Sequence, residues 1–157
     1  MNESGVKSKL GKAEITDILK LLPHRYPFLM VDRIVDMEGD RSATGIKNVT
    51  ANEPYFQGHF PGNPVMPGVI LIEAMGQTGA VLMSKSLDAD VKGKAIFFMS
   101  VDGVRFRRPV RPGDVLRMHV QVTRHRGDLF KFRGETFVDG KLAAEAEFAA
   151  MVVETAS

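Results

Sequence analysis

The amino-acid sequence predicts an α+β fold in which a curved antiparallel sheet of about six strands wraps around one long central helix. The first observation is the helical segment 68–87, where Glu73 is the only charged residue between Pro67 and Ser84. A surface helix would carry a charged stripe opposite its apolar face, so this helix is expected to be enclosed. Segment 116–123 alternates apolar and polar residues with the period of a half-buried strand. Short turns join most of the strands, which favours antiparallel pairing.

The other elements follow in order along the chain. A short amphipathic helix is predicted at 15–22, where Pro23 ends it. Strands are predicted at 28–37 and 42–49, and the glycine- and proline-rich segment 52–68 is expected to be an ordered, irregular loop. After the long helix, strand is expected at 95–101 and 103–107, interrupted or bulged near Asp102-Gly103. Further strands are expected at 116–123, 129–138 and 142–153, with a hairpin turn at Asp139-Gly140.

Length and composition exclude several classes of protein. The 157 residues fit one domain, and the absence of cysteine excludes disulfide scaffolds, thiolate metal sites and thiol nucleophiles. The net charge of +2 is too small to indicate a nucleic-acid binder. The polar N-terminus lacks a secretory signal, and the most apolar stretch, 65–84, contains proline, glutamate and three glycines, which disfavours a membrane span. A cytoplasmic location is predicted.

Glu73 is the first candidate for chemistry. A lone carboxylate on a buried helix has a raised pKa unless a partner pairs with it. Gln77 lies four residues on, on the same helical face, and could donate a hydrogen bond to Glu73. A buried glutamate of raised pKa suits a general acid near neutral pH. The alternative is a structural role, in which Glu73 pairs with an arginine of the sheet or points out through a gap.

His59 is the second candidate, in the loop sequence GHFPGNPVMPG of residues 58–68. Its glycines and prolines restrict the backbone and allow close approach, so His59 could be a positioned general base. A structural histidine that binds loop carbonyls is equally compatible with this pattern. Gly68 begins the helix, where free N–H groups suit a developing oxyanion.

The remaining histidines give weaker signals. His119 and His125 fit a solvated surface, and for His24 a structural hydrogen bond is the favoured interpretation. No pair of histidines has the spacing of a metal site, so no metal is expected. The stretch from Val104 to Arg133 contains nine basic and two acidic residues, a charge pattern that would attract an acidic partner. A solvated sheet face is equally compatible with that charge.

Two motifs carry a family resemblance. The segments LPHRYPFLMVDRI (22–34) and GHFPGNPVMPGVILIEAMGQ (58–77), with FFMSVDGVRFRRPVRPGD (97–114), resemble the bacterial 3-hydroxyacyl-[acyl-carrier-protein] dehydratases of type II fatty acid synthesis. The resemblance spans nearly the whole chain after residue 13. It implies a hot-dog fold, with a single domain over 13–157 and a flexible N-terminal extension over 1–12.

The resemblance also implies an activity and its residues. The family's catalytic histidine falls on His59, its catalytic glutamate on Glu73, and Gly68 corresponds to the residue whose N–H polarises the thioester carbonyl, with Gln77 in support. No cofactor is implied, because the substrate is carried on the phosphopantetheine of acyl carrier protein. In the family, His59 of one subunit would face Glu73 of the other within a homodimer, and trimers of such dimers are common.

Two further sets of residues are predicted for the substrate and its carrier. Candidate walls of the acyl tunnel are Phe60, Ile70, Leu71, Phe97, Phe98 and Met99. Candidate docking residues for the acidic carrier are Arg105, Arg107, Arg108, Arg111, Arg124 and Arg126. Two other functions remain open: hydrolysis of acyl thioesters on the same fold, and a nucleic-acid-binding module that uses the basic stretch.

Overall fold

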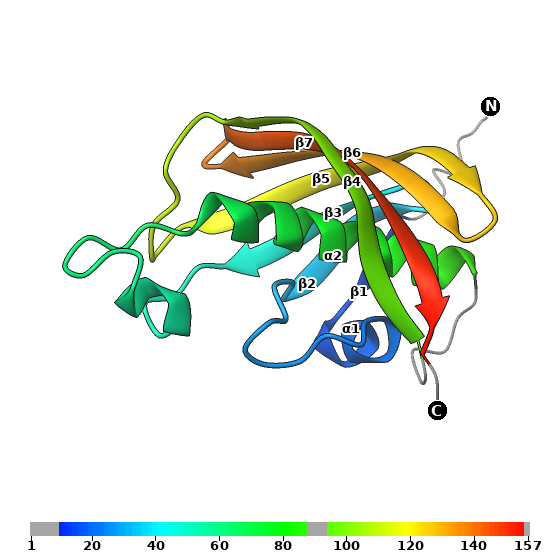
Figure 1. Ribbon diagram of the computed structural model, residues 1–157, viewed down its shortest axis with the longest axis horizontal. Coiled ribbons are helices and arrows are strands. Elements are labelled where there is room, and N and C mark those ends of the chain that lie inside the picture. The colour runs from blue at the N-terminus through cyan, green and yellow to red at the C-terminus, as the bar shows by residue number, and fades with distance from the viewer. Residues whose placement is uncertain (1–9, 88–93, 156–157) are drawn as a thin grey trace, which may run out of the picture.

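The computed structural model describes residues 10–87 and 94–155 as a single curved sheet around one helix (Figure 1). All neighbouring strands are antiparallel, in the order β1-β2-β3-β5-β6-β7-β4. The helices are α1 (Ile15–Leu21), the 3-10 helix η1 (Pro54–Gln57) and α2 (Gly68–Ser86). The strands are β1 (Gly11–Ala13), β2 (Arg33–Glu38), β3 (Ser42–Asn48), β4 (Lys94–Phe106), β5 (Val115–Arg126), β6 (Leu129–Val138) and β7 (Lys141–Glu154). This is the predicted hot-dog arrangement.

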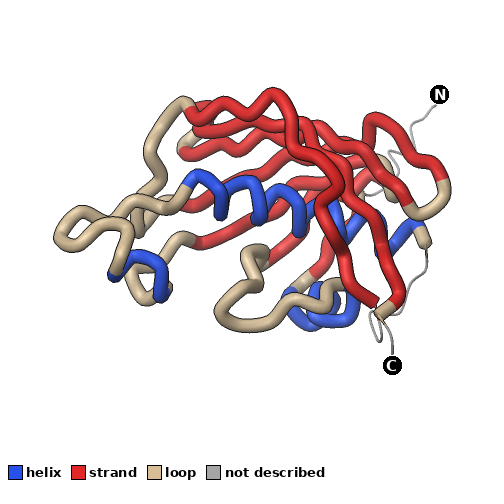
Figure 2. Tube along the Cα trace, in the orientation of Figure 1, coloured by secondary structure: helices blue, strands red, loops and turns tan. Residues whose placement is uncertain are grey.

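Helix α2 is enclosed by the sheet, as its lack of charged residues predicted. Every residue from Ala74 to Ser84 is buried. Strands β3, β5, β6 and β7 contribute the inward-facing side chains that surround it, and Figure 2 shows the strands curving over the helix. Gly76 lies directly beneath the ring of Phe98, with no room for a Cβ atom between them. Within the described residues, no helix is long and apolar enough to cross a bilayer.

Several element boundaries differ from the prediction. Strand β2 begins at Arg33 and not at residue 28, because residues 28–32 form an irregular segment that packs against α2. Residues 95–107 fall almost wholly in one strand, β4, and the bulge expected near Asp102-Gly103 is present as irregular pairing between Asp102 and Arg105. Strand β1 and helix η1 were not predicted. Residues 11 and 12, expected in the flexible extension, belong to β1, whereas residues 1–9 lie outside the described residues.

Within residues 10–87 and 94–155, strand β4, which has thirteen residues, pairs with β7 alone and forms an edge of the sheet. It exposes an unusual amount of apolar surface. Phe97 and Met99 are 55% and 56% exposed, and Phe98, Val101 and Phe106 are also exposed. A long unpaired edge that carries apolar side chains is a template for pairing with another chain.

The loops before α2 form the end of the molecule that projects beyond the sheet (Figure 1). A buried ion pair between Lys47 and Glu53, with 2.7 Å between Nζ and Oε1, joins the end of β3 to the start of η1. Arg111 donates a hydrogen bond to Asn63 Oδ1 at 2.8 Å, which ties the β4–β5 connection to the loop before α2. These contacts hold the segment that carries His59.

Candidate active site

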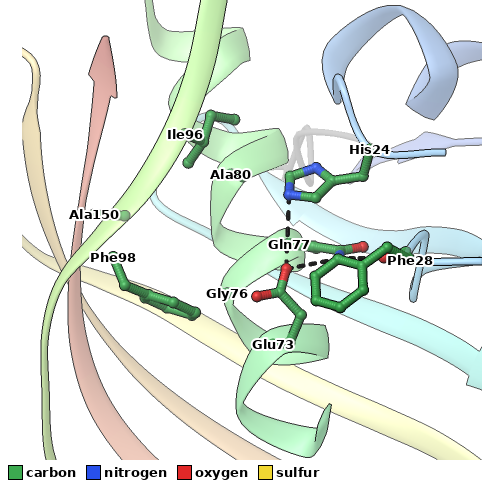
Figure 3. A pocket seen from close by; sticks show the side chains of 9 residues that line it. All are labelled: His24, Phe28, Glu73, Gly76, Gln77, Ala80, Ile96, Phe98 and Ala150. Carbon is green, nitrogen blue, oxygen red and sulfur yellow. Dashed lines mark hydrogen bonds and ion pairs between the residues drawn. The ribbon is translucent and has the colours of Figure 1, made fainter. Parts of the chain in front are cut away.

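Glu73 lies in the second turn of α2 and lines a cavity of about 140 Å³ (Figure 3). The walls of this cavity come from α2, from the segment after α1 and from the two strands β4 and β7. Its lining residues are His24, Phe28, Glu73, Gly76, Gln77, Ala80, Ile96, Phe98 and Ala150. Most of these side chains are apolar, so the carboxyl group of Glu73 stands in a poorly solvated environment. Burial therefore raises the pKa of Glu73, and the hydrogen bond from Gln77 offsets part of that rise.

Gln77 connects Glu73 to the segment before β2. Its Nε2 donates to Glu73 Oε2 at 2.8 Å and to the Phe28 carbonyl at 2.7 Å, and its Oε1 accepts from the Met30 N–H at 2.7 Å. The amide is only 1% exposed, and all three bonds are short. The predicted hydrogen bond between Glu73 and Gln77 is therefore present, and Gln77 fixes one oxygen of the carboxylate.

His24 is a member of this cavity that sequence reasoning missed. Its Nε2 lies 3.6 Å from Glu73 Oε2, and the side chain is only 16% exposed. Burial, with the nearby Arg25 charge, lowers the pKa of His24, so the ring is neutral at neutral pH. The structural hydrogen bond expected for His24 is absent within the described part of the chain: the Nδ1 atom of the ring is buried there without a hydrogen-bond partner.

His59 lies in the projecting loop, between η1 and α2. Its Nδ1 is 2.6 Å from the Val65 carbonyl oxygen, which can only accept a hydrogen bond. The proton of a neutral ring is therefore on Nδ1, and Nε2 has the lone pair that a general base needs. The Phe60 ring stacks on the imidazole with 4.0 Å between ring centroids. The His59 backbone N–H is bound to the Tyr55 carbonyl at 3.1 Å, which adds η1 to the support.

Gly68 shares a cavity of about 460 Å³ with His59. Val69 and Leu71 of α2 and the segment 106–110 form its other walls. Gly68 is the first residue of α2, where backbone N–H groups have no partner within the helix. The Phe106 ring covers it so closely that a Cβ atom there would lie 2.8 Å from the ring. A glycine at this position therefore allows the Phe106 ring to pack directly against the first turn of α2.

Within one chain, the structure does not bring all the predicted catalytic residues together. His59 and Gly68 line one cavity, and Glu73 and Gln77 line the other. The predicted tunnel residues divide in the same way, with Phe98 beside Glu73 and Leu71 beside His59. Ile70 is half-buried, and Phe60, Phe97 and Met99 are exposed.

The predicted docking arginines form two separate groups. Arg107 and Arg108 line the His59 cavity, and Arg111 binds the loop before α2. Arg124 and Arg126 lie near the other end of β5. A strand of twelve residues is roughly 36 Å long, so these two arginines are far from the end of β5 that is near His59. Arg105 is exposed on β4. The predicted docking arginines therefore belong to one basic stretch of the sequence, but they do not form one continuous basic surface on a single chain.

A metal site has no support among the described residues. No group of three or more histidine, aspartate or glutamate side chains lies close enough there to hold an ion.

Comparison with known proteins places this chain in a family. A FabA-like domain is matched over residues 22–147. The protein named 3-hydroxyacyl-[acyl-carrier-protein] dehydratase FabZ of Caulobacter vibrioides (strain NA1000 / CB15N) is 68% identical over 155 residues, with 99% of this chain and 98% of the relative covered. The protein of the same name from Caulobacter sp. (strain K31) is 64% identical, with 99% and 95% covered. The chain therefore belongs to the FabA-like family, within the 3-hydroxyacyl-[acyl-carrier-protein] dehydratases.

Solved structures confirm the fold class. The dehydratase heterocomplex ApeI:P from Xenorhabdus doucetiae matches with a TM-score of 0.73 at 18% identity, over 85% of this chain and 89% of that chain. A hypothetical thioesterase with coenzyme A from Streptococcus pneumoniae matches with a TM-score of 0.57 at 12% identity, over 79% and 87%. At these identities the likeness concerns the fold alone.

Proposed function

We propose that the chain removes water reversibly from a (3R)-hydroxyacyl thioester on acyl carrier protein and so forms the trans-2-enoyl thioester. The observation that carries the proposal is the combination of a base with a free lone pair, a helix N-terminus and a carboxyl group of raised pKa. Relatives at 64–68% identity that are named as such dehydratases support it.

Each residue has one role in the proposed reaction. His59 Nε2 takes the weakly acidic proton from C2, while the Gly68 N–H stabilises the enolate-like charge on the carbonyl oxygen. The protonated carboxyl group of Glu73 gives its proton to the 3-hydroxyl, the C3–O bond breaks, and water leaves. His59 ends with one proton more and Glu73 with one fewer, so the site is reset when that proton returns to Glu73 through water. No step needs a cofactor.

The complete site is proposed to form in a homodimer. His59 and Gly68 of one subunit would meet Glu73 of the partner subunit, because the two halves of the site lie in separate cavities of one chain. The unpaired edge of β4, with its exposed phenylalanines and Met99, supports a second copy of this chain as its occupant. A trimer of such dimers and a cytoplasmic location remain predictions from the sequence.

The acyl tunnel and the carrier surface complete the proposal. The apolar side chains around the two cavities, Phe98 and Leu71 among them, would shield the acyl chain from water. The carrier would dock on Arg107, Arg108 and Arg111, the arginines nearest to His59. The Michaelis constant for the carrier should then rise with ionic strength; a constant that salt does not change would contradict electrostatic docking.

The test is the intact mass of 3-hydroxyacyl carrier protein after incubation with the protein, with His59→Ala and Glu73→Gln as variants. Wild type should remove one water, and each variant should lose about 10²–10⁴-fold in turnover. Near-normal turnover by Glu73→Gln would show that the acid assignment is wrong. Release of free thiol from a saturated acyl thioester would instead indicate the hydrolase.

Mixing the two inactive variants tests the shared site. When both chains are refolded or expressed together, we expect about a quarter of the wild-type activity, because half of the random dimers are mixed and each holds one complete site. If each chain held its own site, mixing would restore nothing.

A further inference from the structure

The segment between α1 and β2 places His24 against the carboxyl group of Glu73. The ring lies in the same cavity, and its Nε2 faces Glu73 Oε2 at 3.6 Å (Figure 3). Arg25 does not compete for this contact, because its guanidinium is bound to the carbonyls of Leu19, Leu22 and His24. Among the residues that line the cavity, His24 and Glu73 are the two that titrate.

The two oxygens of Glu73 have different surroundings. Oε2 accepts the hydrogen bond from Gln77 and faces His24. The other oxygen, Oε1, has no hydrogen bond in the described part of the chain, and in Figure 3 it points away from both side chains toward the side of Phe98. Oε1 is therefore the oxygen that is free to exchange a proton with a bound substrate.

The position of the imidazole proton follows from the surroundings of its two nitrogens. The ring is neutral, since burial opposes its charge, so one nitrogen has a hydrogen and the other a lone pair. With the hydrogen on Nδ1, a buried N–H would have no acceptor, and the Nε2 lone pair would face the carboxylate oxygen. With the hydrogen on Nε2, the ring faces Oε2 with a donor, and only a lone pair is unpartnered, which costs less than an orphaned N–H.

We propose that His24 is a positioning residue for Glu73. The neutral imidazole ring of His24, protonated on Nε2, donates a hydrogen bond to Glu73 Oε2 as the carboxylate forms. The inference rests on the proposed role of Glu73 as the acid. The 3.6 Å separation is a few tenths of an ångström longer than an N–H···O hydrogen bond, and charge-assisted bonds are shorter still. The contact therefore tightens when Glu73 Oε1 gives its proton to the leaving hydroxyl. His24 keeps its own proton throughout the step.

The test compares His24→Leu, which removes the donor, with His24→Gln, which places an N–H donor at a similar reach. For His24→Leu we expect kcat to fall about 10- to 100-fold, the cost of a hydrogen bond to a charged group, while KM changes by less than about twofold. The alkaline limb of the pH profile should move up by about one unit, because the carboxylate loses a donor. His24→Gln should keep kcat within about threefold of wild type, a rescue that a purely space-filling role does not explain.

A direct readout separates this inference from the proposed function. The carboxyl carbon of Glu73 can be titrated by NMR, and its pKa should be higher in His24→Leu than in wild type and close to wild type in His24→Gln. An unchanged titration and an unchanged kcat in His24→Leu would overturn the inference, as would a His24→Gln variant that is folded but equally impaired. Normal turnover by Glu73→Gln would overturn the proposed acid role instead.

Two controls complete the design. His125→Leu changes an exposed histidine at the far end of β5 and should leave kcat and the pH profile unchanged. If His24→Leu does not fold, His24→Met supplies the unbranched apolar side chain for the same comparison with His24→Gln.

Discussion

Replacing Gln77 by methionine tests whether one buried amide holds both the fold and the proposed acid, Glu73, in place. Methionine has a similar volume and an unbranched side chain, so the change removes three hydrogen bonds without opening a large cavity. The Met30 N–H loses its acceptor in a site that is buried from water. An orphaned buried donor costs about 1–3 kcal/mol, and the losses at the Phe28 carbonyl and Glu73, which are partly exposed, cost less.

The expected sum for Gln77→Met is about 2–4 kcal/mol of unfolding free energy. For a chain of this length each kcal/mol moves Tm by about 2–4 °C, so Tm should fall by about 5–15 °C. Calorimetry and urea unfolding measure both quantities, and Gln121→Met, on an exposed residue of β5, is the matched control. Turnover of the hydroxyacyl carrier substrate should fall as well, because the carboxylate of Glu73 loses its anchor. A loss below about 0.5 kcal/mol would refute the reasoning that buried donors must be satisfied here.

Three further predictions concern stability. Glu73→Gln should raise Tm more at pH 8 than at pH 4. The buried carboxyl group of Glu73 has a raised pKa, so it lowers the stability of the fold as pH rises through its pKa in the folded state. An equal change in Tm at both pH values would contradict burial as the cause of the raised pKa. Lys47→Met should lower the free energy of unfolding by about 3–5 kcal/mol, because it leaves the largely buried Glu53 carboxylate unpaired. The double variant with Glu53→Leu should lose less than Lys47→Met alone, as measured by urea unfolding. If the losses of the two single variants simply added, the pair would not be coupled. Gly45→Ala should cost about 1–3 kcal/mol, because its Cβ would collide with Thr78 Oγ1; calorimetry should then show partial recovery with Thr78→Ala.

Features that lie within one element could be predicted from the sequence. The missing charged face of segment 68–87 predicted an enclosed helix, and the i,i+4 spacing predicted the bond between Gln77 and Glu73. Both conclusions depend only on helix geometry, which is fixed by 3.6 residues per turn. The strands were found by the same local reasoning, except β1, whose three residues are too few to establish a period.

Features that depend on how elements meet could not be predicted. His24 and Glu73 are 49 residues apart, and no periodicity in the segment 23–32 indicates which helix it packs against. The basic residues from Arg105 to Arg126 are continuous in sequence, but β5 is extended and carries the last of them to the opposite end of the sheet. Residues that are close in sequence can therefore lie far apart in space when they are carried by an extended strand.

The cost of burying Glu73 is linked to its proposed task. A general acid must hold its proton until the leaving group needs it, and a poorly solvated cavity achieves this by opposing the charged form. The same cavity would hinder the reaction if nothing stabilised the carboxylate that remains. Gln77, and in our proposal His24, supply donors to Oε2 alone and leave Oε1 without a partner in the described part of the chain. In this proposal the apolar walls raise the pKa of the acid and the donors stabilise the product anion at one oxygen, so that the two requirements do not compete for the same atom.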